Sequence, residues 1–168
     1  MAFTYKRSGI NYELMDAFKN ACLKASNNNA PFKEFPDFYL LDILEGLGSL
    51  NKLADEIFKL CGKDFSYQIG WGNAASIIND LSVTGAKPLT IKLFVAAGHQ
   101  NWFIEKKRWQ NLIKGFREAA KYSGASWNGG ETQTLVGLVN PKSMVLAGSA
   151  TGIIKPKSRI LLEVKIQV

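Results

Sequence analysis

The order of apolar segments along the chain constrains its fold more than any other feature. Apolar residues at every second position, or in short runs with β-branched residues, indicate strands, whereas apolar residues three and four apart indicate amphipathic helices. The two kinds are mixed without strict alternation. This favours an α+β fold, a two-layer α/β sandwich with helices on a mixed sheet, over a doubly wound parallel sheet. We predict strands over residues 38–44, 89–97, 143–154 and 160–168, and helices over residues 11–25, 50–60, 72–84 and 105–122.

Capping and turn residues support these boundaries. Asn11 is a suitable N-cap for the first helix, and Gly62, Gly85 and Gly124 follow the other three. Residues 27–37 contain two prolines and are expected to form a loop.

Composition narrows the class of protein. A chain of 168 residues with 46% hydrophobic residues is typical of one globular domain, here taken as residues 1–168. The single histidine, His99, excludes paired-histidine zinc sites within one chain. Cys22 and Cys61 lie among apolar residues, and we predict that both are buried free thiols in a reducing compartment.

The start of the chain lacks the apolar core of a signal peptide, and no apolar run is long enough to span a bilayer. We therefore expect a cytoplasmic protein that is not bound to a membrane.

Charge is unevenly distributed. Residues 1–84 carry 8 Lys and Arg against 10 Asp and Glu, whereas residues 85–168 carry 13 against 4. The basic half suggests anionic partners. The helix over residues 105–122 carries several of these cations around an apolar stripe, and we expect them on a solvated face. A nucleic-acid interface is the competing interpretation, but no recognised nucleic-acid-binding motif supports it. The cations in question are Lys106, Lys107, Arg108, Lys114, Arg117 and Lys121.

The segment Gly70-Trp71-Gly72-Asn73-Ala74-Ala75 fits a dinucleotide-binding pattern, GxGxxA. That pattern also needs an acid about 20 residues later to hold the ribose. No Asp or Glu lies between Asp80 and Glu105. We therefore interpret the glycines as a tight start of the helix over residues 72–84.

Three segments rich in small residues each carry a carboxylate: residues 45–49, 79–80 and 129–132. We expect turns at the first and third. Glycine lets the backbone approach phosphate oxygens, and carboxylates hold the Mg²⁺ that accompanies a nucleotide. On the helix that carries Asp80, Asn73, Ser76 and Asp80 share one strip beside an apolar stripe, so Asp80 is expected at the edge of the core.

The joint order of these segments resembles the N-terminal domain of aminoimidazole ribonucleotide synthetase (phosphoribosylformylglycinamidine cyclo-ligase). This family belongs to an ATP-dependent superfamily that includes selenophosphate synthetase and thiamine-monophosphate kinase. The resemblance covers residues 5–154. It rests on Tyr5-Lys6-Arg7-Ser8-Gly9-Ile10-Asn11, Glu45-Gly46-Leu47-Gly48-Ser49-Leu50, Ile78-Asn79-Asp80, Gly85-Ala86-Lys87-Pro88-Leu89, Gly129-Gly130-Glu131-Thr132 and Leu146-Ala147-Gly148.

The resemblance implies a function. Domains of this family pair their sheets across a homodimer and bind ATP near that interface. The enzymes use ATP to phosphorylate an amide oxygen of a small phosphorylated substrate. They then close an imidazole ring, a step of purine biosynthesis. By this resemblance, Glu45, Asp80 and Glu131 would hold Mg²⁺. The residues expected to bind ATP or its phosphates are Lys6, Gly46, Gly48, Ser49, Asn79, Gly129, Gly130 and Thr132.

The chain also departs from the family pattern. Glu45 replaces an aspartate, Leu50 replaces a lysine, and Leu93 replaces an aspartate after the Pro-Leu pair. The family's second domain is absent from residues 1–168. We therefore expect the N-terminal domain of a longer enzyme or a divergent relative. The alternative is a non-catalytic module for nucleotide binding or dimerisation.

Overall fold

The computed structural model describes residues 9–26 and 32–161. The chain divides into two compact units, Met1–Pro31 and Phe32–Val168, and each is described by itself.

The described part of the first unit, residues 9–26, contains one helix, α1 (Tyr12–Ala25). The Asn11 side chain accepts hydrogen bonds from the backbone N–H groups of Glu13 and Leu14, which confirms the predicted N-cap. The apolar stripe of α1 is exposed, with 71% of Leu14 and 73% of Phe18 accessible to solvent. Cys22 lies on this helix and is exposed, so the predicted burial of its thiol is wrong.

The second unit is built on a five-stranded sheet in the order β1-β2-β5-β3-β4. Strands β3 and β4 are parallel, and the other neighbouring pairs are antiparallel. The sheet is therefore mixed, as predicted. The strands are β1 (Phe32–Glu34), β2 (Tyr39–Gly46), β3 (Lys87–Ala97), β4 (Ser126–Thr134) and β5 (Met144–Ile154).

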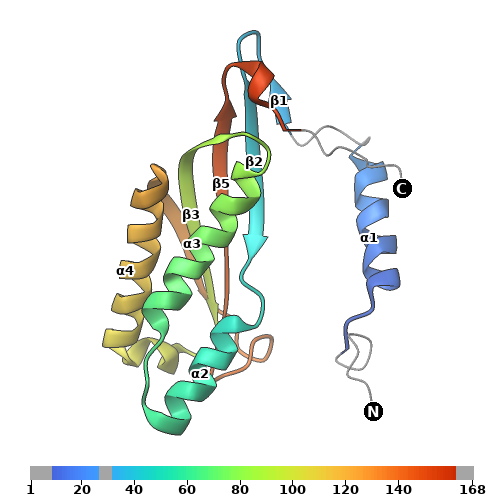
Figure 1. Cartoon of the computed structure of the whole chain (residues 1–168). Helices are drawn as coiled ribbons and strands as arrows, with labels where there is room; N and C mark the ends of the chain where they lie inside the picture. The colour runs from blue at the N-terminus through green and yellow to red at the C-terminus, as the bar shows by residue number, and fades with distance from the viewer. Residues whose placement is uncertain (1–8, 27–31, 162–168) are drawn as a thin grey trace, which may run out of the picture. The chain divides into compact units, whose positions relative to one another are not determined.

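Helices pack on the sheet, which confirms the α+β class. They are α2 (Leu50–Cys61), α3 (Ser66–Ser82) and α4 (Lys106–Ser123), with short 3₁₀ helices η2 (Gln100–Ile104) and η3 (Lys157–Arg159). Helices α3 and α4 run side by side over one face of the sheet (Figure 1). Helix α4 lies in the connection from β3 to β4, because parallel neighbouring strands need such a crossover.

The core lies between this helical layer and one face of the sheet. Along β5, alternate residues from Met144 to Ile154 are buried, and the residues between them face the other side, which we call the open face. The predicted apolar stripe of α3 is buried as expected. It consists of Ala74, Ile77, Ile78 and Leu81.

Two glycines allow α3 and α4 to pack closely. A Cβ atom at Gly70 would lie 2.0 Å from the carbonyl oxygen of Leu112, and one at Gly115 would lie 2.0 Å from the carbonyl oxygen of Tyr67. Gly70 and Gly72 lie inside α3, which spans Ser66–Ser82, so the predicted helix start at these glycines is wrong. The helix begins at Ser66, whose N–H donates a 2.9 Å hydrogen bond to Asp64 Oδ1.

Three other expectations are corrected. Residues 129–132 lie in an edge strand rather than a turn, with Gly129 at φ +147° and Gly130 close to the backbone of Leu93. Residues 32–34 form β1 within the predicted loop. Glu45 and Gly46 end β2 instead of beginning the turn.

The last two predicted strands, over residues 143–154 and 160–168, have different outcomes. The strand over residues 143–154 is confirmed as β5. Ile160 and Leu161 are not in a strand, and the remainder of the predicted strand, residues 162–168, lies outside the described residues.

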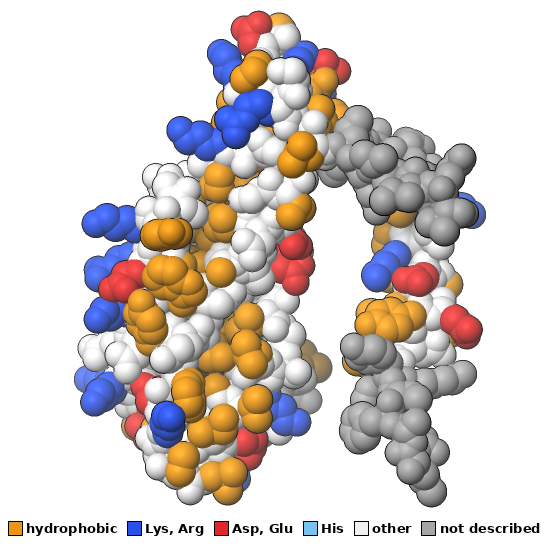
Figure 2. All heavy atoms as spheres, in the orientation of Figure 1, with side chains coloured by type: hydrophobic (Ala, Val, Ile, Leu, Met, Phe, Trp, Pro, Cys, Tyr) orange, Lys and Arg blue, Asp and Glu red, His pale blue; other side chains and the backbone are white. Residues whose placement is uncertain are grey.

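Helix α4 carries a basic outer face. Figure 2 shows Lys and Arg side chains along its edge and hydrophobic side chains over the middle of the helical layer. Lys106, Lys107, Lys114, Arg117 and Lys121 are exposed, as predicted for a solvated face. Arg108 is an exception, because it is buried.

Candidate functional site

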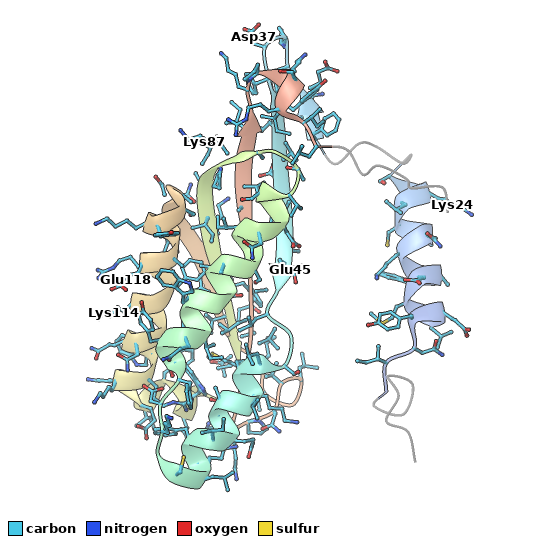
Figure 3. All side chains as sticks on the ribbon, viewed as in Figure 1. Lys24, Asp37, Glu45, Lys87, Lys114 and Glu118 are labelled. Atoms are coloured by element: carbon cyan, nitrogen blue, oxygen red, sulfur yellow. The ribbon has the colours of Figure 1, made fainter. Side chains whose placement is uncertain are left out.

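Two predicted metal ligands, Glu45 and Asp80, meet at the helical face of the sheet. Glu45 pairs with Gly148 of β5, and a Cβ atom at Gly148 would touch Ile77 of α3, so this register position faces the helices. Burial raises the pKa of Glu45, and the negative charge of Asp80 and a hydrogen bond with Asp80 raise it further. Figure 3 labels Glu45 near the end of β2.

This pair suits a small divalent cation. Mg²⁺ is usually held by one or two carboxylates together with substrate phosphates. A cation between Glu45 and Asp80 would remove the repulsion that raises the pKa of Glu45. The pair therefore fits the predicted metal, although Asp80 is more exposed than the predicted position at the core edge.

The connection from β2 to α2 follows directly after Glu45. Gly48 has φ +71°, a conformation that favours glycine, and α2 begins at Leu50 after Ser49. The side chain of the N-cap residue Ser49 makes no capping hydrogen bond to α2. The first N–H groups of α2 and the helix dipole would favour an anion at this end. Gly46, Gly48 and Ser49 are exposed there, directly after Glu45 in the sequence.

The third predicted metal ligand, Glu131, lies elsewhere. It is opposite Phe94 of β3 and lines a hollow of about 470 Å³ with Gly129, Gly130 and Lys92. Leu44 and Ser149, which are paired across β2 and β5 on the open face, also line it. Among residues 9–26 and 32–161, no group of three or more Asp, Glu, His or Cys side chains could hold a metal ion. One copy of the chain thus brings together Glu45 and Asp80 but not Glu131.

Two other predicted residues, Asn79 and Thr132, lie away from both the acid pair and the hollow that contains Glu131. Asn79 lines a groove of about 350 Å³ between α3 and α4, although it is next to Asp80 in sequence. Thr132 lines a pocket beneath α4 and points away from the hollow that contains Glu131. Lys6 lies outside the described residues.

Sequence reasoning missed a buried polar network that joins α2, α4 and β5. Arg108 Nη2 lies 2.6 Å from Asp55 Oδ1, and Ser143 Oγ donates a 2.7 Å hydrogen bond to Asp55 Oδ2. Asn51 donates from its side chain to the Met144 carbonyl. The spacing along the helix could have indicated that Arg108 is buried. Arg108 precedes the buried Leu112 and Phe116 by four and eight positions, and therefore lies on the same helix face.

A second carboxylate extends this network. Arg108 Nε lies 3.8 Å from Asp64 Oδ1, and Asn111 donates a 2.8 Å hydrogen bond to Asp64 Oδ2. Burial by itself would raise the pKa of Asp64. Hydrogen bonds from Ser66 and Asn111 and the charge of Arg108 outweigh that effect and lower the pKa. The network holds the start of α2 and the start of α3 against α4, and so fixes the elements that flank the acid pair.

Neither cysteine contributes to a site. Cys61, at the end of α2, is exposed and donates a weak hydrogen bond to the Ile57 carbonyl, so the predicted burial is wrong for this residue too. No helix within residues 9–26 or 32–161 has the length and apolar character needed to cross a membrane.

Comparison with solved structures shows the same fold in other proteins. Thiamine monophosphate kinase from Aquifex aeolicus superposes with a TM-score of 0.57 over 83% of this chain and 43% of its own, at 10% sequence identity. At that identity the likeness concerns the fold alone.

Comparison of sequences identifies the family. The chain is 29% identical to the phosphoribosylformylglycinamidine cyclo-ligase of Caldicellulosiruptor saccharolyticus over 90% of its length and 46% of the relative. It is 27% identical to the cyclo-ligase of Pyrococcus horikoshii over 98% of its length and 50% of the relative. The chain thus spans about half the length of these relatives. Residues 55–154 match the family described as AIR synthase related protein, N-terminal domain. Together with the two-layer fold, this match shows that the chain belongs to the AIR synthase related protein family and carries its N-terminal domain.

Proposed function

We propose that this chain is the ATP-binding domain of a phosphoribosylformylglycinamidine cyclo-ligase-like enzyme that acts in the cytoplasm. Such an enzyme phosphorylates an amide oxygen of a small phosphorylated substrate with ATP and closes an imidazole ring in purine biosynthesis. The proposal depends chiefly on one observation, the meeting of Glu45 and Asp80 beside the glycine-containing connection to α2.

Each group in this region has a distinct role in the proposal. Glu45 and Asp80 hold Mg²⁺, whose charge balances that of the nucleotide phosphates. The exposed backbone of Gly46, Gly48 and Ser49 and the first turn of α2 bind phosphate oxygens. The proposal is supported by two curated cyclo-ligases that align with 90% and 98% of this chain.

A titration with ATP tests nucleotide binding. In excess Mg²⁺, isothermal titration calorimetry should show saturable binding, and Asp80→Ala should weaken it at least tenfold because the metal loses one of two protein ligands. Glu105→Gln removes an exposed acid at the start of α4 and should leave the affinity unchanged. Failure of the wild-type chain to bind ATP at millimolar nucleotide would contradict the proposal.

The alternative function is a nucleotide-binding or dimerisation module without catalysis. It is favoured by Leu50 and Leu93, which stand at positions where the family carries a lysine and an acid. Phosphate release from ATP in the presence of formylglycinamidine ribonucleotide would rule out this alternative. Binding without release would rule out catalysis by this chain on its own.

We further propose that two copies pair through the open face of the sheet. Leu44 is 78% exposed and Val145 is 45% exposed on this face, so apolar side chains there are available to a partner. The hollow containing Lys92 and Glu131 opens on the same face. Pairing would therefore place Gly129, Gly130 and Glu131 at the interface, where they are available to a phosphorylated ligand.

A further inference from the structure

Helix α4 carries a basic surface whose charges are not neutralised by ion pairs. Five exposed cations lie on this helix against one carboxylate, Glu118. With the other described residues, α4 forms ion pairs only through Arg108, which is buried. The positive potential of the exposed cations is therefore available to an anionic partner. These cations are Lys106, Lys107, Lys114, Arg117 and Lys121.

Three of these cations form a straight line, which we call the basic ridge. Lys107, Lys114 and Lys121 are seven residues apart, close to two helical turns, so their side chains leave the same side of α4. At a rise of about 1.5 Å per residue, neighbouring members are about 10 Å apart along the helix axis. The ridge therefore suits an extended anionic chain better than one compact anion.

Three aromatic rings lie beside the basic ridge and form a row, which we call the aromatic row. The ring centroids of Tyr67 and Trp71 on α3 are 6.3 Å apart, and those of Trp71 and Tyr122 on α4 are 6.1 Å apart. Lys114 Nζ lies 5.9 Å from the Tyr67 ring centroid, so the ridge and the row are adjacent. In Figure 2, cations line the edge of α4 and hydrophobic side chains lie next to them.

The one carboxylate of α4 does not cancel the charge of the ridge. Glu118 Oε2 accepts a 2.7 Å hydrogen bond from the Tyr67 hydroxyl, which holds this carboxylate at the α3 side of the helix. The ridge keeps three lysines against this single acid. The surface is therefore basic along α4 and aromatic between α4 and α3.

The aromatic row ends at the groove of about 350 Å³ between α3 and α4. Trp71 and Tyr122 both line this groove, and Tyr122 is 86% exposed. Tyr and Trp side chains are enriched at interfaces because one end of the ring system is apolar and the other is polar. The ring of Tyr122 is thus open to a flat partner that stacks on it.

Charge and rings together select the partner. An acidic peptide would meet the lysines but would leave the aromatic row unused. Duplex nucleic acid contains rings, but their faces are covered by base stacking. A single strand offers both a phosphate chain and free base faces, and basic grooves with aromatic side chains bind this combination.

Polar residues of the groove favour RNA over DNA. Asn79 and Ser82 line the groove and are exposed. Neither side chain is hydrogen-bonded to another residue in the described part of the chain, so both remain available to a ligand. A ribose 2′-hydroxyl donates and accepts hydrogen bonds, and it is the group by which a protein distinguishes RNA from DNA.

We propose that the outer face of α3 and α4 binds single-stranded RNA. The phosphates lie along the basic ridge, a base stacks on Tyr122 at the groove, and Asn79 and Ser82 contact the ribose. Binding does not depend on base sequence, because phosphate contacts and stacking carry little information about the base. The proposal does not depend on nucleotide binding at Glu45 and Asp80.

Fluorescence anisotropy with the full chain and a labelled single-stranded RNA of about 12 nucleotides tests binding. At about 50 mM salt the Kd should be about 100 μM or lower, and it should rise with salt because phosphate contacts are electrostatic. DNA of the same sequence should bind several-fold more weakly, since it lacks the 2′-hydroxyl. Absence of RNA binding, or equal binding of the DNA, would overturn the proposal.

Substitutions at Tyr122 test the stacking. Tyr122→Ala should weaken binding of the single-stranded RNA about tenfold, as expected for one lost base stack, and should not change the affinity for the same RNA as a duplex. Tyr122→Phe keeps the ring and should keep the affinity. Because Tyr122 is 86% exposed, both variants should fold. An alanine variant that binds the single strand as tightly as the wild type, or that loses duplex affinity equally, contradicts the stacking and overturns the proposal.

The salt dependence tests the basic ridge. Lys114→Gln/Lys121→Gln should reduce the slope of log Kd against log salt concentration by about 1.4, since each contact to a single strand contributes about 0.7. The matched control, Lys33→Gln/Lys155→Gln, removes the same charge from two exposed lysines at β1 and after β5. It should leave the slope unchanged. Equal effects of the two double variants, or displacement of the RNA by polyglutamate at the same charge concentration, would overturn the proposal.

Discussion

Arg108 Nη2 lies 2.6 Å from Asp55 Oδ1, although the two residues belong to different helices and both side chains are buried. Asp55 also accepts a hydrogen bond from Ser143, the residue directly before β5. The ion pair therefore connects α2, α4 and the sheet. Removing one member of such a pair leaves an uncompensated charge in the protein interior.

Loss of this ion pair should destabilise the fold. We expect Arg108→Ala to lower the free energy of unfolding by about 3–5 kcal/mol, because Asp55 is left buried and without its counter-charge. Urea denaturation followed by circular dichroism measures the change. Lys107→Ala, at the exposed neighbouring position, should change it by less than about 0.5 kcal/mol. Equal effects of the two substitutions would show that the ion pair has no special role.

The close packing of α3 on α4 gives a second prediction. Gly70→Ala would place a methyl group 2.0 Å from the Leu112 carbonyl oxygen, so the helices must separate. We expect a loss of about 1–3 kcal/mol in the free energy of unfolding. Gly72→Ala, two positions later in the same helix, meets no atom within 4 Å and should stabilise the chain by about 0.4–1 kcal/mol. Thermal or urea unfolding of the pair should give opposite signs, and the same sign for both would contradict the close packing.

The raised pKa of Glu45 makes stability depend on pH. Because the folded state binds this proton more tightly than the unfolded state, its contribution is fully present below the ordinary value of 4.5. That contribution is lost as the pH rises through the higher pKa of the folded state. In metal-free buffer, the stability of the wild-type chain relative to Glu45→Gln should therefore fall as the pH increases above 4.5. A relative stability that rises over this range would show that the pKa is lowered instead.

A single charged substitution tests the proposed pairing of two copies through the open face. Leu44→Asp places a carboxylate on this face and should convert a dimer into a monomer in sedimentation velocity experiments. Leu60→Asp alters an equally exposed leucine, 84% accessible on α2, and should leave the dimer intact. A monomeric wild-type chain at micromolar concentration would contradict the pairing.

Much of the fold was predictable from local pattern. Helix α4 and strands β3 and β5 have strong periodicity and clear ends, and the structure has them within two residues of the predicted bounds. The wrong predictions concern glycines that lie against the backbone of another helix or strand. Gly70 is typical of a helix boundary but lies inside α3 because α4 approaches its backbone, and Gly130 is in an edge strand because the backbone of Leu93 lies close to it.

The candidate site was predictable only in part. The sequence placed Asp80 on the correct helix but Glu45 in a turn after the strand, whereas Glu45 belongs to β2. Its register position in the sheet faces the helices and brings it to Asp80. Glu131 was grouped with them by motif order, but motif order carries no information about which face of the sheet a side chain occupies. Arg108 was assigned to the solvated face with its lysine neighbours because its partner, Asp55, is distant in sequence.

The coupling between Mg²⁺ and ATP tests the central claim most directly. We would measure the ATP affinity of the wild-type chain and of the Glu45→Gln/Asp80→Asn double variant by calorimetry, once with excess Mg²⁺ and once with EDTA. If the two carboxylates hold the metal beside the phosphates, Mg²⁺ should strengthen ATP binding to the wild-type chain at least tenfold and have little effect on the variant. Equal strengthening in both proteins, or none in the wild-type chain, would contradict the account.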